Sequence, residues 1–172
     1  MKLFKTGIIG CGRIGSLLEE DPLRGKPCTH AGGFSALPAI RLSAGCDINP
    51  ERLQKFGNRW NVPELYSDHR EMLAKETLDI LCIATWTSLH ATMTLDAVKA
   101  GVKGIFCEKP IDMSAERIRA CIKATTEANV AFLTAFNRRF DPNFADIQTR
   151  IAAGEIGNVE LITILSRDPA PP

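Results

Sequence analysis

A glycine-rich turn is the first feature of this sequence that could do chemistry. It directly follows the apolar run LFKTGIIG at 3–10, and apolar residues at helical spacing come after it. Between a strand and a helix, such spacing lets the first glycine make a tight turn, the second admit a pyrophosphate close to the backbone, and the third pack the helix on the strand. We therefore predict a nucleotide site. Its residues are Gly10, Cys11, Gly12, Arg13, Ile14 and Gly15.

An acid at the end of the next apolar run narrows the choice of nucleotide. Asp47 ends the run IRLSAGCD at 40–47, and no arginine follows it directly. A carboxylate at the tip of the second strand can accept hydrogen bonds from the ribose hydroxyls of NAD, and it repels the 2′-phosphate of NADP. The pattern favours NAD. Two alternatives stay open at this point: a methyltransferase that binds S-adenosylmethionine at a similar turn, and an Asp47 that only caps the turn before Pro50.

The stretch between the glycine turn and Asp47 is longer than such a unit needs. Asp47 stands 32 positions after the last glycine, against about 20 in the usual motif. The surplus contains residues that break helices, namely Asp21, Pro22, Gly25, Lys26 and Pro27. We expect the first helix to end after Glu20 and to resume over about 30–37, with an inserted loop at about 16–30. The loop could arch towards the cofactor or the substrate, or it could only decorate the surface, as insertions more often do. Within it we single out His30, although a lone histidine more often caps or packs.

Short apolar runs alternate with amphipathic segments along the chain. We predict strands within 3–10, 40–46, 78–85, 101–108 and 130–136, and helices over 50–60, 69–75, 88–100 and 114–128. Asn49 before Pro50, and Ser114, have the residue types of helix N-caps. The alternation predicts an α/β fold with a doubly wound parallel sheet, whose near-continuous apolar strands are covered on both faces.

Two polar segments end neighbouring strands of this predicted sheet. The segment from Thr85 to His90 follows one strand, and Glu108, Lys109 and Pro110 follow the next. The carboxyl ends of parallel strands meet at one edge, where such folds bind ligands. A lysine at a strand end, beside a carboxylate, can donate a hydrogen bond or relay a proton to a substrate hydroxyl. This segment argues against a methyltransferase.

The composition excludes several other classes of protein. Hydrophobic residues make up 45% of the 172 residues and charged residues 24%, which is the balance of a globular protein. The net charge of +1 indicates neither nucleic acid nor an anionic membrane as partner. The apolar run near the N-terminus is too short to span a membrane. The six cysteines form no Cys-x-x-Cys pair and are expected to be reduced, buried thiols. We expect a cytoplasmic protein and assign no metal site.

These motifs, in this order, resemble the Gfo/Idh/MocA family, which comprises the glucose-fructose oxidoreductases, the inositol dehydrogenases and the MocA-like oxidoreductases. The resemblance covers essentially the whole chain. The matching segments are GIIGCGRIG at 7–15, Asp47, ATWTSLHA at 84–91, EKP at 108–110, FNRRFDPNF at 136–144 and GEIGNVELITILSRDPAPP at 154–172. The last segment looks most like the inositol 2-dehydrogenases.

The resemblance implies an NAD(P)-dependent oxidoreductase that moves hydride between the nicotinamide and a secondary alcohol of a sugar, an inositol or a similar polyol. It places the pyrophosphate on residues 10–15. It further implies Asp47 on the adenosine ribose, a cofactor-lining loop of Thr85, Trp86, Thr87 and His90, Glu108 near the nicotinamide ribose, Lys109 as the catalytic lysine, and Asn137 and Arg138 beside the nicotinamide. Trp86 departs from the Pro or Asn often found in that loop, and the insertion at 16–30 is a second departure.

The end of the sequence covers only the start of the second α/β domain that members of this family carry. We expect an NAD-binding domain over 1–136, then a bridging helix over 141–153 and a first strand over 159–166. In the family, the rest of that domain supplies the substrate pocket, the usual oligomer interface, and an Asp and a His that assist proton transfer. The chain is therefore interpreted as the cofactor half of a polyol dehydrogenase that is a homo-oligomer at full length. The alternative is a non-catalytic NAD-binding or interaction module.

Overall fold

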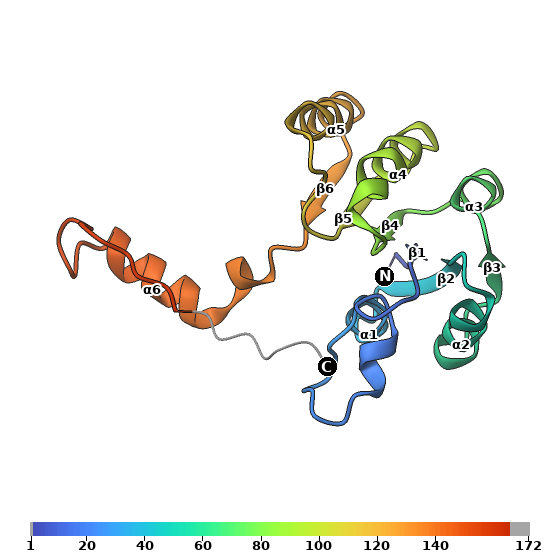
Figure 1. Ribbon diagram of the computed structural model, residues 1–172, viewed down its shortest axis with the longest axis horizontal. Coiled ribbons are helices and arrows are strands. Elements are labelled where there is room, and N and C mark those ends of the chain that lie inside the picture. The colour runs from blue at the N-terminus through green and yellow to red at the C-terminus, as the bar shows by residue number, and fades with distance from the viewer. Residues whose placement is uncertain (1, 166–172) are drawn as a thin grey trace. The chain divides into compact units, whose positions relative to one another are not determined.

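Six parallel strands form one sheet in the order β3-β2-β1-β4-β5-β6 (Figure 1). The computed structural model describes residues 2–165. The strands are β1 (Phe4–Ile9), β2 (Ile40–Cys46), β3 (Glu64–Tyr66), β4 (Ile80–Ile83), β5 (Gly104–Cys107) and β6 (Ala131–Thr134). The doubly wound parallel sheet is confirmed, but β3 was not expected. It is three residues long and begins with the exposed Glu64, so it lacks the apolar run that marks the other strands.

Helices cover both faces of this sheet. They are α1 (His30–Ser35), α2 (Pro50–Trp60), α3 (His69–Lys75), α4 (Thr87–Lys99) and α5 (Ala115–Glu127), with a 3-10 turn η1 at Leu17–Glu20. In Figure 1, α3, α4 and α5 lie above the strands and α1 and α2 below them. The predicted break after Glu20 and the resumption at His30 are both confirmed.

The expected caps begin two of these helices. The Asn49 side chain accepts a hydrogen bond from the Arg52 backbone N–H, and Pro50 occupies the first turn of α2. Ser114 accepts from the backbone N–H of Arg117 at the start of α5. These bonds satisfy donors that the first helical turn leaves without a partner, so each helix starts directly after its strand-end loop.

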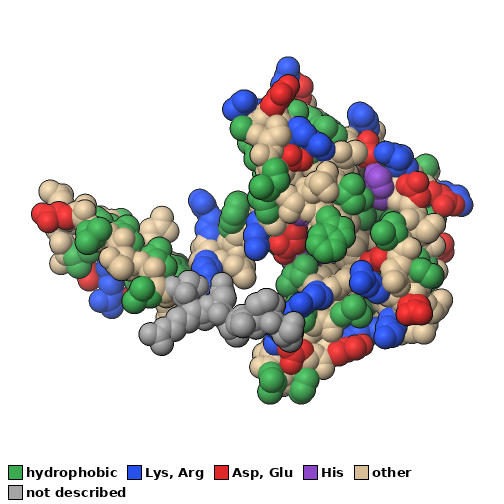
Figure 2. Space-filling view, viewed as in Figure 1, with side chains coloured by type: hydrophobic (Ala, Val, Ile, Leu, Met, Phe, Trp, Pro, Cys, Tyr) green, Lys and Arg blue, Asp and Glu red, His purple; other side chains and the backbone are tan. Residues whose placement is uncertain are grey.

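The core has two parts, one on each side of the sheet. Leu81, Ile83 and Met72 belong to the cluster under α3 and α4, and Ile8 and Phe56 to the cluster under α1 and α2; all are at most 2% exposed. The prediction of reduced thiols fits this packing, because all six cysteines are free and only Cys28 is not fully buried. Opposite charges are interspersed on the face drawn in Figure 2, in keeping with the small net charge.

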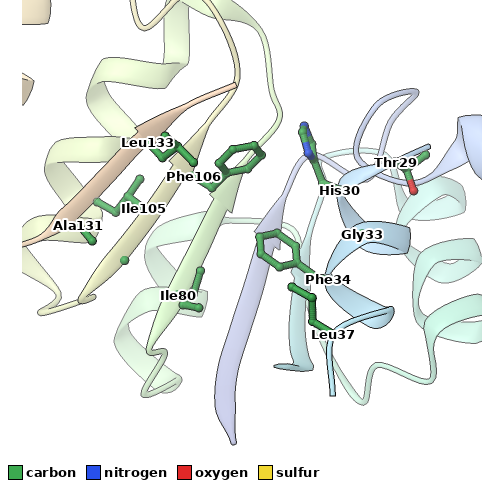
Figure 3. A pocket seen from close by; sticks show the side chains of 11 residues that line it. Thr29, His30, Gly33, Phe34, Leu37, Ile80, Ile105, Phe106, Ala131 and Leu133 are labelled. Atoms are coloured by element: carbon green, nitrogen blue, oxygen red, sulfur yellow. The ribbon is translucent and has the colours of Figure 1, made fainter. Parts of the chain in front are cut away.

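One part of the sheet lacks the expected second cover. On the α1 side, an apolar groove of about 490 Å³ runs over β4, β5 and β6. Figure 3 shows His30 and Phe34 of α1, with Leu37 just after this helix, on one wall and the strand residues on the other. Leu133 of β6 is 46% exposed there. The sequence pattern predicted burial on both faces, but in β6 Ala131 and Leu133 are exposed, and Phe132 and Thr134 are only half-buried.

The chain divides into two units, residues 1–135 and 136–172. The second contains a 3-10 turn, η2 (Asn137–Phe140), and helix α6 (Pro142–Ala152), which coincides with the expected bridging helix and is capped by Asp141. The strand expected at 159–166 is wrong for residues 159–165, which form no strand. A strand needs a hydrogen-bonded partner, and no described residue of this unit provides one. Ser166 lies outside the described residues. Within 2–165, no helix has the length and apolar character needed to cross a membrane.

Candidate cofactor site

The residues predicted to do chemistry follow the strands at one edge of the sheet. Ile9 of β1 pairs in register with Cys46 of β2 and with Ile83 of β4, and Ile83 pairs with Cys107 of β5. The next residue of each strand therefore stands in one row. That row is Gly10, Asp47, Ala84 and Glu108. Parallel pairing thus brings the glycine turn, the acid and the Glu108 segment together, although they are far apart in sequence.

The three glycines of the turn are required for different reasons. Gly10 has φ +95°, and an added Cβ would collide with the Ala84 carbonyl oxygen. An added Cβ on Gly15 would collide with the carbonyl oxygen of Gly10. At Gly12, by contrast, an added Cβ would meet no protein atom within 4 Å. The first and third glycines are therefore required by the fold itself, while the second borders open space, as a backbone that admits a pyrophosphate should.

The turn presents free backbone donors. No protein group among the described residues accepts from the N–H groups of residues 12–15. The carbonyl oxygen of Gly12 accepts from Ser16, so these four N–H groups belong to the first turn after the strand. Unpaired donors gathered at the start of such a turn bind anions. The chain's own atoms therefore fit a pyrophosphate here.

Asp47 is tied to the turn. Its Oδ2 accepts from the Cys11 backbone N–H at 2.8 Å and its Oδ1 from the Asn49 N–H at 2.8 Å. The residue as a whole is only 8% exposed. The Cys11 N–H is therefore bonded within the protein and is not available to a ligand. The Cys11 thiol is fully buried, and burial raises its pKa far above the ordinary value, so the thiol is unreactive. The Cys11 side chain packs in the core cluster under α1 and α2.

The insertion is fastened back onto the turn. The buried Glu19 carboxylate accepts from the backbone N–H groups of Cys28 and Thr29, and from the Thr29 hydroxyl at 2.6 Å. Beyond this anchor, the His30 N–H donates to the Ile14 carbonyl at 3.0 Å. After the loop, the chain thus returns to the glycine turn. The first two residues of α1, His30 and Ala31, donate their N–H groups to the carbonyls of Ile14 and Gly15, which belong to the residues that present the free donors.

His30 and Glu108 meet across this edge. His30 Nε2 lies 2.9 Å from Glu108 Oε1, and the two side chains are 12% and 16% exposed. The His30 ring packs edge-on against Phe106, with centroids 5.1 Å apart. The two residues are 78 positions apart. No local pattern assigns this partner, so sequence analysis could only single out His30 within the inserted loop.

Glu108 and Lys109 differ in their surroundings. Burial raises the pKa of Glu108, but the hydrogen bond and charge of His30, with the N–H and charge of Lys109, outweigh it, so the pKa lies below its ordinary value. Glu108 is therefore a carboxylate at neutral pH. The exposed Lys109 donates its backbone N–H to Glu108 Oε2 at 3.1 Å, and its ammonium has no partner among the described residues. It is free to meet a ligand.

The loop after β4 places its residues differently from one another. Trp86 is 79% exposed at the start of α4, and Thr85 and Thr87 are half-buried. His90 is only 1% exposed, with Nδ1 2.7 Å from the Pro110 carbonyl and Nε2 3.0 Å from the Thr85 carbonyl. In this arrangement, His90 joins the two strand-end loops from inside the protein and presents no surface to a ligand.

Asn137 and Arg138 lie in the second unit. Both are exposed residues of η2. The structure therefore brings together the predicted residues of 10–15, 47, 85–90 and 108–109, and describes these two within their own unit.

Comparison with known proteins now decides the family. A family model described as "Oxidoreductase family, NAD-binding Rossmann fold", the Gfo/Idh/MocA family, matches residues 4–136. The chain belongs to this family. The resemblance drawn from the motifs is confirmed, and with it NAD as the cofactor of the fold and the assignment to its oxidoreductases. The methyltransferase alternative is thereby excluded.

Individual family members resemble this chain over almost all of its length. It is 37% identical to inositol 2-dehydrogenase of Rhizobium meliloti, over 98% of this chain and 46% of the relative. It is 36% identical to an uncharacterized oxidoreductase, YrbE, of Bacillus subtilis, over 99% of this chain and 46% of the relative. The chain thus spans about half the length of these relatives.

A solved structure shows the same fold. Scyllo-inositol dehydrogenase of Lactobacillus casei, determined with bound NAD(H) and scyllo-inositol, superposes with a TM-score of 0.80 at 26% identity. The match covers 91% of this chain and 43% of that protein. The sheet described above is therefore the sheet of an NAD-binding family member.

Proposed function

We propose that this chain is the cofactor-binding half of an oxidoreductase that transfers hydride between NAD and a secondary alcohol of a sugar, an inositol or a similar polyol. The observation that carries this proposal is the row of residues at one sheet edge, with free donors at 12–15, Asp47 on one side and Glu108 and Lys109 on the other. The relatives named as inositol dehydrogenases support the polyol class.

Each residue of the row has a role in this proposal. The N–H groups of 12–15 bind the pyrophosphate, and Asp47 accepts from the adenosine ribose, which makes NADP the poorer ligand because the carboxylate repels a 2′-phosphate. Glu108 binds the nicotinamide ribose. Bound NAD supplies the hydride acceptor or donor. Lys109 Nζ hydrogen-bonds the substrate oxygen and holds or moves its proton.

The remaining predicted residues frame the cofactor. We assign Thr85, Trp86 and Thr87 to its lining, and Asn137 and Arg138 to the border of the nicotinamide, as the family resemblance implies. His90 supports this lining through its two carbonyl contacts.

We further propose that residues 137–172 begin the family's substrate and oligomerisation domain, and that the full-length protein is a homo-oligomer acting on a small polyol rather than on nucleic acid. The six free thiols favour the reducing cytoplasm as its location.

Calorimetric titration with NAD and NADP tests the cofactor half of the proposal. The chain should bind NAD more tightly than NADP. Asp47→Asn should cut this preference by about tenfold, because the repelling charge is lost. Glu51→Gln removes an exposed acid from the start of α2 and should leave the preference unchanged. Equal binding of both nucleotides by the wild-type chain would contradict the role of Asp47.

The catalytic half needs a different measurement. The intact mass of the native protein, captured from its source cells, tells whether this chain is a portion of a longer protein. If it is, the whole protein should reduce NAD with inositols or sugars, and Lys109→Met should lower kcat by about a hundredfold or more while NAD affinity stays unchanged. A native protein of this length that binds NAD and oxidises no polyol would support the alternative, a non-catalytic module.

A further inference from the structure

We propose that His30, which no sequence motif assigned, is a positioning residue that orients the Glu108 carboxylate for the nicotinamide ribose. The inference rests on the proposed function, because the ribose is its ligand. It also gives the inserted loop a role in the site, because the end of this loop places His30 at the sheet edge.

The first argument is the geometry of the carboxylate. Each oxygen of Glu108 has its own protein donor: His30 Nε2 at 2.9 Å on Oε1 and the Lys109 backbone N–H at 3.1 Å on Oε2. Two donors on different oxygens fix both the direction and the plane of the group. Because a carboxylate oxygen can accept more than one hydrogen bond, the fixed group can still accept from hydroxyl groups of a ribose. An oriented acceptor loses less entropy on binding than a mobile one.

The second argument is that His30 is itself held in place. Its ring packs edge-on against Phe106 of β5, and its backbone N–H is bonded to the Ile14 carbonyl of the glycine turn. Thr29 caps α1 by accepting from the Gly32 N–H at 3.1 Å. The ring therefore cannot move away from Glu108 without loss of packing. Through its backbone N–H and its ring, His30 connects the glycine turn with Glu108.

The third argument concerns the proton. Glu108 is ionised at neutral pH and can only accept, so His30 must carry hydrogen on Nε2. The other titratable groups near Glu108 are Lys109 and the buried thiols of Cys82 and Cys107. Burial raises the pKa of both thiols, that of Cys107 to about 12, so they stay neutral. His30 and Lys109 are thus the groups that set the charge state of Glu108.

Three substitutions separate positioning from packing. His30→Gln places an amide N–H near the position of Nε2 and can still reach Glu108. His30→Asn is the matched control, because its amide lies near the position of Nδ1 and falls short. His30→Phe keeps a ring against Phe106 and removes the donor. Circular dichroism and the amide NMR spectrum check that each variant is folded.

The Glu108 carboxyl carbon can be titrated by NMR in the chain without nucleotide, with its signal assigned through Glu108→Gln. In His30→Phe and His30→Asn, the pKa of Glu108 should rise, because burial then acts with less opposition. In His30→Gln, it should stay closer to the wild-type value. NAD affinity should fall about tenfold in the Phe and Asn variants and return to within about threefold in the Gln variant.

The outcomes distinguish the inference from the proposed function. If the wild-type chain binds no NAD, the proposed function fails and this role for His30 fails with it, whatever the titration shows. If the wild-type chain binds NAD and the Phe variant binds it equally well, the positioning role is wrong and the proposed function stands. Equal behaviour of the Gln and Asn variants would also overturn it, because a packing role does not distinguish the two amide positions.

Discussion

Single residues of the glycine turn separate what the fold requires from what the ligand requires. Gly15 is needed by the protein, because its missing Cβ would occupy the place of the Gly10 carbonyl oxygen. Gly12 is needed by no protein contact within 4 Å. The same residue type thus serves packing at one position and ligand approach at another, and the motif alone does not tell the two apart.

This difference predicts opposite effects for two alanine substitutions. Gly15→Ala should lower the free energy of unfolding by about 1–3 kcal/mol, because the backbone must shift to relieve a collision. Gly12→Ala should leave that free energy within about 0.5 kcal/mol and weaken NAD binding about tenfold or more by narrowing the approach. Urea denaturation and calorimetric NAD titration of both variants measure these effects. Loss of stability in Gly12→Ala with unchanged NAD binding would reverse the assignment.

At the scale of elements, the insertion changes how α1 reaches the site. In place of one helix running from the glycine turn, the chain makes the 3-10 turn η1, a loop, and a short α1 that starts at His30. Glu19 holds the two ends of the loop together through three hydrogen bonds from Cys28 and Thr29. The position of α1, and with it that of His30, depends on this anchor.

The anchor predicts a specific pH dependence of stability. Burial raises the pKa of Glu19, but the hydrogen bonds from Thr29 and Cys28 outweigh it and lower the pKa below its ordinary value. A lowered pKa in the fold means that Glu19 stabilises the protein above the pKa of the unfolded chain, about 4.3, and that this contribution is lost as the pH falls through the folded value.

Comparison with Glu19→Gln isolates this contribution. At pH 7 the variant should be less stable by about 1.5–3 kcal/mol, because a charged acceptor has lost its charge. The difference should shrink below about pH 4. Urea denaturation of both proteins from pH 3 to pH 7 measures it, and Glu20→Gln, at the exposed neighbour, is the control. A difference independent of pH would show that the charge of Glu19 contributes nothing.

At the scale of the whole molecule, the two core clusters lie within residues 1–135, in the first of the two units. The second unit has no buried residue in its helices η2 and α6. Stability in a protein comes mainly from buried apolar surface. The first unit therefore holds almost all of the stabilising contacts among the described residues.

A chain ending at residue 135 should consequently fold by itself. Its free energy of unfolding should lie within about 1 kcal/mol of that of the full chain. A chain ending at residue 128 loses β6, whose Phe132 packs against the core, and should fail to give a cooperative transition. Urea denaturation followed by circular dichroism distinguishes them. A large loss on truncation at 135 would mean that the second unit stabilises the first.

The sequence by itself determined the fold class, the glycine turn, Asp47, the helix break after Glu20 and the caps at Asn49 and Ser114. These features depend on local rules: apolar periodicity, the left-handed backbone of glycine, and side chains that satisfy the first N–H groups of a helix. Sequence analysis did not predict the short β3, because only its pairing with β2 makes it a strand. The strand expected at 159–166 is wrong over residues 159–165 for the same reason, since none of the described residues of its unit pairs with it.

Only the tertiary structure decided which residues act together. It paired His30 with Glu108 across 78 positions, moved His90 from the cofactor lining to a buried link between two loops, and left one face of β6 open. The physical reason is that parallel pairing aligns the ends of strands that are distant in sequence. No local sequence pattern identifies which side chains then meet. Local patterns determine the elements, and packing determines the neighbours.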